Sequence, residues 1–246
     1  MTAVLLVAHG SSDPRAAATT RALARAVAAQ QPGLDVRSAF LDHAGPRPDE
    51  VLFELARHGH HAAVVVPLLL TAAFHGRIDL PGVLDRAERA GLRMPVITTD
   101  VLGPIGGVTH PLLLAALRSS LPQVDHDGVV LAAAGTRDDL ARDSVDVAAH
   151  ALSAALGVPC LAAFASASPV TGAATVAALR ARGCTRIAVS SYFLASGRLY
   201  DTVVASALSA GALSPVAPPL GSSPDMARLV MSRVLAAAPA TLDRAA

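Results

Sequence analysis

The sequence predicts an α/β fold of two tandem domains, each a small parallel sheet flanked by helices, related by internal duplication. Short apolar segments alternate with longer amphipathic ones, and the apolar segments are apolar throughout rather than at every second residue. Strands buried on both faces have this continuous apolar character. The βαβα order predicts parallel strands joined by right-handed crossovers, and the second half of the chain repeats that order.

Each element of the first half follows from a local pattern. Apolar runs bounded by Gly, Pro or Asp predict strands, and the amphipathic stretches between them predict helices. The expected strands cover residues 2–8, 34–41, 62–69 and 95–100. The expected helices cover residues 14–30, 48–58, 80–90 and 110–120. A glycine follows the first strand of each half, as a tight strand-to-helix turn requires.

The duplication rests on four matches that occur in the same order in both halves. The matched pairs are Val4 to Ser11 with Val129 to Thr136, Ala39 to Asp42 with Ala163 to Ser166, Gly59 to Leu70 with Gly183 to Leu194, and Leu102-Gly103 with Leu220-Gly221. Four ordered matches indicate an internal repeat. The expected domains are residues 1–121 and 128–240, joined by a linker from Leu121 to Gly128 that contains a Pro and a polar run.

The residue content excludes several function classes. All 20 basic residues are Arg, so the chain lacks the Lys that a P-loop, a Schiff base or pyridoxal-phosphate chemistry needs. A net charge of +1 without a run of like charge argues against a nucleic-acid partner. Cys160 and Cys184 have no C-x-x-C spacing, which argues against a disulfide framework or a thiolate metal site.

The N-terminus and the apolar segments predict a cytoplasmic protein with no membrane partner. Met1 leads into a strand pattern without the basic region of a signal peptide. No apolar segment approaches the roughly 18 residues of a membrane span without charges or turn signals.

Three polar residues of the first half are replaced by others in the second. They fall at the carboxyl ends of expected strands or in the loops that follow, where open α/β sheets bind their ligands. Two imidazoles and a carboxylate there can converge on a divalent metal and accept protons. Each could instead be structural, but their joint replacement favours a functional site. The pairs are His9 with Ala134, Asp42 with Ser166, and His75 with Leu199.

Three motifs in order carry a family resemblance. They are Val7-Ala8-His9-Gly10-Ser11 followed by Asp13-Pro14-Arg15, then Phe40-Leu41-Asp42 before Pro46, then Val66-Pro67-Leu68-Leu69-Leu70 followed by His75 and Asp79-Leu80-Pro81. With these motifs the chain resembles the sirohydrochlorin chelatases of the class II, ATP-independent chelatase superfamily. The resemblance spans nearly the whole chain and includes the duplication, which is typical of the two-domain bacterial form.

The resemblance implies two flavodoxin-like, chelatase-like domains that face each other across a cleft, where metal enters sirohydrochlorin. It implies that His9 and His75 hold the incoming metal and help to remove the pyrrole protons. Asp42 would be the third polar partner. The family usually has Glu at that position, so the shorter Asp42 leaves its direct metal contact open. His43 beside it is an alternative, although its side chain should point the opposite way if the strand continues.

The macrocycle carries eight carboxylates, and Arg is well shaped to bind them. The candidates are Arg15, Arg77 and Arg198, with Gly10 and Ser11 as further substrate contacts. We expect no permanently bound cofactor, because the divalent metal, Fe²⁺ or Co²⁺, is itself a substrate. Fe²⁺ is favoured because sirohaem synthesis is the commoner use of the two-domain form. A monomer is the simplest expectation, since one duplicated chain supplies both halves of the cleft.

Other interpretations of the sequence remain open. A non-enzymatic carrier of metal or tetrapyrrole would use the same residues as a chelatase. A serine hydrolase would need a G-x-S-x-G elbow, which the chain lacks. The cluster His58, His60 and His61 falls at a helix end, where favourable charge explains it better than metal storage. His110, at the start of a helix, is an additional candidate.

Overall fold

The computed structural model describes residues 2–71 and 80–237. It confirms the α/β class, with two all-parallel sheets flanked by helices. The strands are β1 (Thr2–Ala8), β2 (Val36–Phe40), β3 (Ala62–Pro67), β4 (Val96–Thr98), β5 (Gly128–Ala133), β6 (Cys160–Phe164) and β7 (Ile187–Tyr192). The helices are α1 (Pro14–Ala28), α2 (Pro48–Arg57), α3 (Leu80–Arg89), α4 (Pro111–Ser120), α5 (Asp139–Leu156), α6 (Gly172–Ala181), α7 (Arg198–Ser209) and α8 (Pro224–Ala237).

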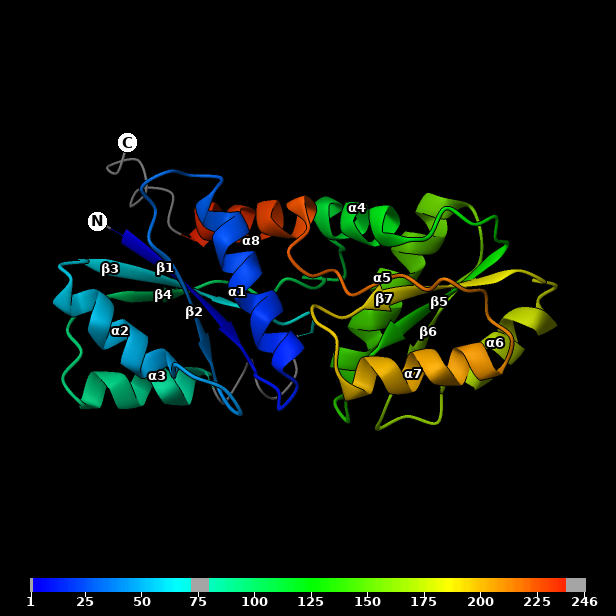
Figure 1. Ribbon diagram of the computed structural model, residues 1–246, viewed down its shortest axis with the longest axis horizontal. Coiled ribbons are helices and arrows are strands. Elements are labelled where there is room, and N and C mark those ends of the chain that lie inside the picture. The colour runs from blue at the N-terminus through cyan, green and yellow to red at the C-terminus, as the bar shows by residue number, and fades with distance from the viewer. Residues whose placement is uncertain (1, 72–79, 238–246) are drawn as a thin grey trace. The chain divides into compact units, whose positions relative to one another are not determined.

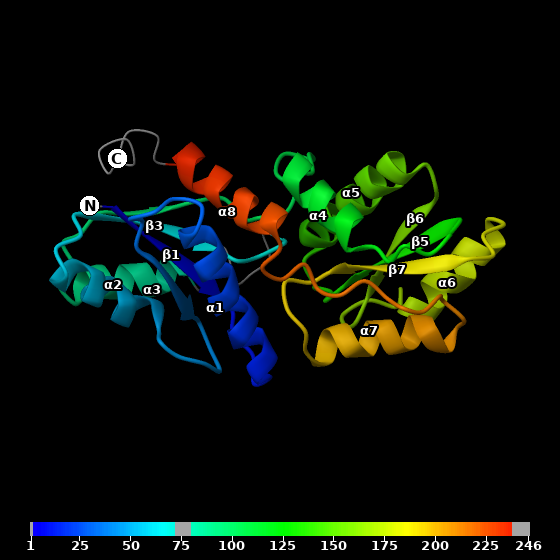
Figure 2. The ribbon, with the colours of Figure 1, turned by 45° about the horizontal axis from the view of Figure 1, so that its top comes forward.

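The first sheet has the strand order β2-β1-β3-β4, with β1 between two parallel neighbours. Val4 of β1 pairs with Val36 on one side and Val64 on the other. Helices α1 and α8 cover one face of this sheet, and α2 and α3 cover the other (Figures 1 and 2). Because the strands are parallel, the loops after β1, β2 and β3 leave from one edge, which we call the carboxyl edge.

The second sheet has the strand order β6-β5-β7, so β5 occupies the place that β1 has in the first sheet. Residues from alternate positions of β5 and β7, such as Val130 and Val189, pack against α6 and α7 in one core. Cys160 and Cys184 are free buried thiols, and burial raises the pKa of Cys160 to about 12. None of the helices in the described ranges combines the length and apolar character that crossing a bilayer requires.

The compact units differ from the sequence repeats in the placement of two helices. The first unit holds β1 to β4, α1 to α3 and α8; the second holds α4 to α7 and β5 to β7. Helix α8 packs on α1 and β3, and α4 packs on α5 and β7 (Figure 1). The repeat boundaries expected as domain boundaries, 1–121 and 128–240, are therefore not the boundaries of the compact units. Each repeat ends in an amphipathic helix whose apolar face is buried in the unit of the other repeat.

Asp127, just before β5, connects that strand to the segment preceding β7. Its carboxylate accepts hydrogen bonds from the Thr185 N–H (2.9 Å), the Thr185 hydroxyl (2.8 Å) and the Arg186 N–H (2.8 Å). The backbone bonds from Thr185 and Arg186 are the largest causes that lower its pKa to about 2. These donors favour the ionised carboxylate, so the contact stabilises the second unit when Asp127 is charged.

We expect Asp127→Asn to lower the free energy of unfolding of the second unit at pH 7. The folded pKa lies below the ordinary value, so the stabilisation is complete above about pH 4 and disappears as pH falls toward about 2. Chemical denaturation followed by circular dichroism across this range would show the two proteins converging at low pH. Asp125→Asn, which removes an exposed carboxylate that pairs with Arg186, is the control. If Asp127→Asn were as stable as the wild type at pH 7, the Asp127 carboxylate would not stabilise the second unit.

Candidate active site

The loops after β1 and β2 meet at the carboxyl edge of the first sheet through backbone contacts. The Asp42 N–H donates to the His9 carbonyl (2.8 Å), and the Leu41 N–H donates to the Ala8 carbonyl (3.0 Å). Gly10 has a φ of 97°, and a Cβ there would lie 1.8 Å from the Asp42 carbonyl oxygen. Only glycine fits this approach, which brings His9 and Asp42 together.

The side chains of His9, Asp42 and His43 form a small polar cluster at this contact. The His9 Nδ1 atom is buried. The Asp42 carboxylate accepts a hydrogen bond from the His43 N–H (2.8 Å), and its Oδ2 lies 3.6 Å from His43 Nε2. The His43 N–H, and next the charge of the His43 ring, lower the pKa of Asp42, with smaller contributions from His9 and Arg47. Asp42 is therefore ionised at neutral pH and gives the site negative charge.

His43 lies differently from the sequence-based expectation. That expectation, a side chain pointing away from the site, assumed a continuing strand. β2 ends at Phe40, and His43 adopts a left-handed backbone with a φ of 59°. Its ring consequently meets the His9 ring edge to face, with centroids 6.3 Å apart and an interplanar angle of 87°. The turn, rather than strand alternation, decides where this imidazole points.

The second unit has the same backbone arrangement without the imidazoles. A Cβ on Gly135 would lie 2.0 Å from the Ser166 carbonyl oxygen, and Ala167 has a φ of 57°. Ser166 bonds the Ala134 carbonyl through its hydroxyl (3.0 Å). The loop contact is thus a property of the fold, whereas the polar side chains are a property of the first unit.

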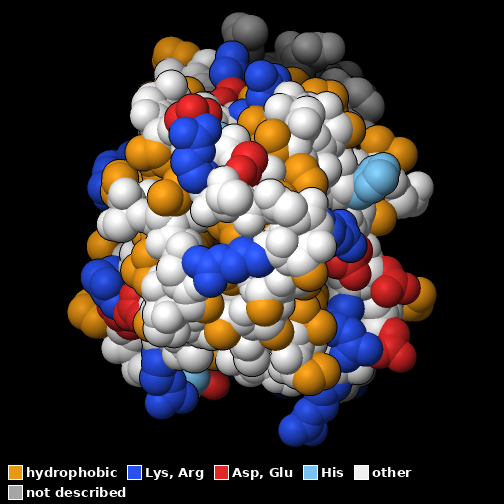
Figure 3. Space-filling view, turned by 90° about the vertical axis from the view of Figure 1, so that its right-hand side faces the viewer, with side chains coloured by type: hydrophobic (Ala, Val, Ile, Leu, Met, Phe, Trp, Pro, Cys, Tyr) orange, Lys and Arg blue, Asp and Glu red, His pale blue; other side chains and the backbone are white. Residues whose placement is uncertain are grey.

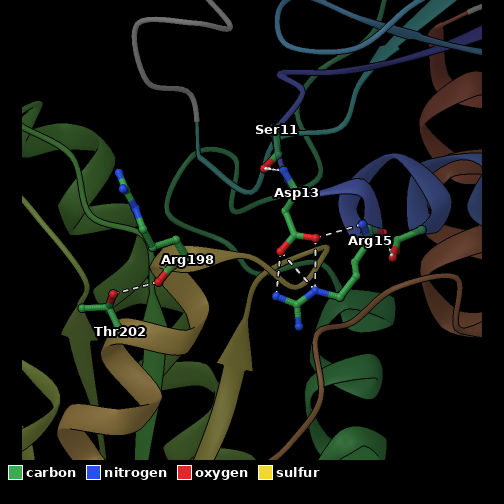
Figure 4. Close-up of polar contacts among 6 residues, drawn as sticks. Ser11, Asp13, Arg15, Arg198 and Thr202 are labelled. Atoms are coloured by element: carbon green, nitrogen blue, oxygen red, sulfur yellow. Dashed lines mark hydrogen bonds and ion pairs between the residues drawn. The ribbon is translucent and has the colours of Figure 1, made fainter.

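Ser11 and Arg15 make local contacts at the start of α1. The Ser11 hydroxyl accepts a hydrogen bond from the Asp13 N–H (3.1 Å), and Asp13 caps the helix by accepting from the Arg15 N–H (2.9 Å). The Arg15 guanidinium folds back onto the Asp13 carboxylate, with Nη2 2.6 Å from Oδ2 (Figure 4). This contact is the largest cause that lowers the pKa of Asp13. Arg15 is therefore already engaged by a carboxylate of the chain.

Thr136 in the second unit accepts a hydrogen bond from the Asp138 N–H (3.2 Å), and Asp138 caps α5. Ser11 thus has a counterpart where the polar site residues are absent, which indicates a role in the turn.

Arg198 is the first residue of α7, the helix that follows β7 in the second unit. Its backbone carbonyl accepts a hydrogen bond from the Thr202 hydroxyl (2.7 Å), and its side chain extends away from that contact (Figure 4). The residue is exposed. Its guanidinium is therefore better placed than that of Arg15 to meet an external carboxylate. The other two expected site residues, His75 and Arg77, lie outside the described residues.

Three other histidines, His58, His60 and His110, make structural contacts. His58 Nδ1 lies 2.8 Å from the Glu54 carbonyl at the end of α2, and His60 Nε2 lies 3.2 Å from Asp35 Oδ2. Asp35 immediately precedes β2, so His60 lies at the opposite edge of the sheet from His9. His110 caps α4 by accepting from the Leu112 N–H (3.2 Å). Within residues 2–71 and 80–237, no three His, Cys, Asp or Glu side chains form a ready metal site.

Comparison with known proteins adds a family match. A family model described as CbiX matches the chain twice, over residues 3–124 and 128–237. The two matches follow the internal repeat and together span nearly the whole chain. A sirohydrochlorin cobaltochelatase of Methanosarcina acetivorans is 27% identical over 86 residues, which is 35% of this chain and 66% of that protein. The match therefore covers just under two thirds of that relative's length.

Two solved structures have the same fold. SirB from Bacillus subtilis with Fe³⁺ matches with a TM-score of 0.82 and 20% identity, over 99% of this chain and 97% of SirB. The sirohydrochlorin chelatase SirB from Bacillus subtilis subspecies spizizenii, in complex with cobalt, matches with a TM-score of 0.79 and 20% identity over the same shares. At this identity the likeness confirms the expected two-domain fold.

Proposed function

The chain belongs to the CbiX family, and from this premise we propose that it is a chelatase that inserts Fe²⁺ or Co²⁺ into sirohydrochlorin without ATP. The names of its relatives support this substrate, and they include both iron and cobalt. The observation that carries the proposal is the meeting of His9 and Asp42 at the carboxyl edge of the first sheet. The second unit repeats the backbone of that contact and lacks both side chains.

The chemistry needs a metal site that releases its ion and a base that accepts protons. Insertion removes water from the metal and two protons from the ring nitrogens. His9 supplies an imidazole that can bind the metal or accept a proton, and the ionised Asp42 attracts the cation. Incomplete ligation by imidazole and carboxylate, without thiolate, holds a divalent ion weakly enough to deliver it. We include His75 as a second metal-binding imidazole on the sequence motif alone.

The experiment that tests the function is anaerobic metal insertion. Purified protein is mixed with sirohydrochlorin and Fe²⁺ or Co²⁺, and visible absorbance is followed against a control without protein. We expect acceleration with at least one metal, and we favour Fe²⁺. Stoichiometric metal or tetrapyrrole binding without turnover would instead support a carrier. No acceleration with either metal would reject the chelatase for this macrocycle.

The proposed partner is the small-molecule tetrapyrrole, handled by a monomer without nucleic acid. On the face drawn in Figure 3, arginine side chains are interspersed with acidic and uncharged ones rather than gathered into one basic patch. Scattered arginines suit individual carboxylates better than a continuous phosphate backbone.

We expect Arg198→Ala to raise the KM for sirohydrochlorin about tenfold with little change in kcat. A charge-assisted hydrogen bond to a substrate carboxylate contributes about 1.5–3 kcal/mol, and this carboxylate is remote from the reacting nitrogens. Arg15→Ala is the matched variant, because its guanidinium is held by Asp13, and we expect a smaller change in KM. Steady-state kinetics at saturating metal would measure both. Equal effects of the two substitutions would contradict the choice of Arg198.

A further inference from the structure

The chain carries a second imidazole beside His9 that the family motif does not include. His43 reaches this place because its backbone turns into the left-handed region directly after Asp42. The Asp42 carboxylate accepts from the His43 N–H (2.8 Å), and this bond stabilises the turn. The His43 ring then lies against the His9 ring with a centroid separation of 6.3 Å.

The repeat shows that the turn and the imidazole are separate features. Ala167 holds the equivalent left-handed position in the second unit, with a φ of 57° against 59° at His43. The fold therefore needs this backbone conformation in both units, and Ala satisfies it. His43 joins His9 and Asp42 as a third polar residue that is present at the contact in the first unit and replaced in the second.

We propose that His43 is a metal ligand of this chain and binds the incoming divalent ion together with His9. The proposal deepens the proposed function, since the bound ion is the metal to be inserted. Asp42 has a supporting role: its carboxylate accepts a hydrogen bond from the His43 N–H and lies beside the pair. The Asp42 carboxylate and the His43 ring are both exposed, and the carboxylate Oδ2 lies 3.6 Å from His43 Nε2.

The geometry fits a shared ion. Two imidazoles that bind one metal at nitrogen distances of about 2 Å have ring centroids at most about 6.5 Å apart. The observed 6.3 Å lies near that upper limit, which corresponds to imidazoles on opposite sides of the ion, and the proposal requires the His43 ring to move toward His9 for the roughly 5 Å of a tetrahedral pair. The side chain of His43 is 52% exposed, so it is open to metal from solvent. Two imidazoles without a closed ligand shell suit a site that must release its metal.

The test measures Co²⁺ binding to the full chain without tetrapyrrole, by isothermal titration and by the visible absorption of the Co²⁺ ion. Asn tolerates a left-handed backbone, so His43→Asn removes the imidazole and keeps the turn. We expect it to raise the Kd for Co²⁺ at least about tenfold and to change the visible spectrum. His61→Asn is the matched control: it removes an exposed histidine preceding β3, at the opposite edge of the sheet, and leaves binding unchanged.

A second variant separates ligation from folding. His43→Gly also allows the left-handed turn, and we expect the same loss of affinity with an unchanged melting temperature. If both variants bind Co²⁺ within twofold of wild type, with the wild-type spectrum, His43 is not a ligand. The result is independent of turnover, because a wild type that inserts no metal would reject the proposed function and leave the binding comparison intact. Conversely, normal turnover with unchanged binding in both variants would reject the His43 assignment alone.

Discussion

Replacing His9 by Ala lowers kcat for metal insertion at least about 100-fold and leaves the folded state intact. A positioned base contributes about 10²- to 10⁴-fold to a rate, and His9 also supplies an imidazole for the metal. The second unit already shows that Ala is compatible with this strand end, since Ala134 precedes a glycine with nearly the same backbone, φ 93° at Gly135 against 97° at Gly10. The change therefore removes chemistry and preserves the loop contact.

Kinetics and thermal melting on the same preparation would measure this effect. His61→Ala serves as the control, because it removes an exposed imidazole far along the chain from the loops of the site. A His9→Ala variant that keeps more than a tenth of the wild-type kcat would place the base elsewhere. A variant that loses activity together with its melting transition would show that His9 acts on folding, contrary to our expectation.

Replacing Gly10 by Ala lowers the free energy of unfolding of the first unit by about 4 kcal/mol or more and removes activity. The added Cβ would lie 1.8 Å from the Asp42 carbonyl oxygen, which is backbone and cannot rotate aside. The two loops must separate, and the hydrogen bond from the Asp42 N–H to the His9 carbonyl is lost with them. The contact that assembles the site is thus also a contact that stabilises the unit.

Gly33→Ala is the matched control for this prediction. Gly33 also has a left-handed backbone, with a φ of 89°, but nothing lies within 4 Å of a Cβ built there. Its substitution carries only the cost of the left-handed conformation, about 1–2 kcal/mol. Denaturant unfolding of both variants isolates the carbonyl contact as the difference between them. Equal destabilisation by Gly10→Ala and Gly33→Ala would show that the close approach to Asp42 contributes nothing.

Much of the fold followed from the sequence because its signals are local. Continuous apolar runs predicted the strands of both sheets, and the repeated glycines predicted the turns at Gly10 and Gly135, which both have a positive φ. The proximity of His9 and Asp42 was predictable too. In a parallel sheet, neighbouring strands end at one edge, and residues at those ends meet whatever the rest of the chain does.

Some local roles were missed although a signal was present. The Ser11-x-Asp13 spacing at a helix start is that of a capping turn, and the same spacing at Thr136 and Asp138 marks it as structural. Arg15 lies two residues after Asp13, and this spacing allows the ion pair that the two side chains form. The helix-start contacts of Ser11, Asp13 and Arg15 leave Arg198 as the stronger candidate for binding a substrate carboxylate.

The sequence by itself determined the α/β class, the duplication and the half of the chain that carries the polar site. These follow from the pattern of apolar residues and from the repeat, which are both features of the linear sequence. Tertiary structure alone decided two further points. It assigned α4 and α8 to the unit of the other repeat, since an apolar helix face does not specify which sheet will bury it. It also turned His43 toward His9, since that direction depends on a left-handed backbone, shared with Ala167 of the second unit, and on the approach of Gly10 to the Asp42 carbonyl.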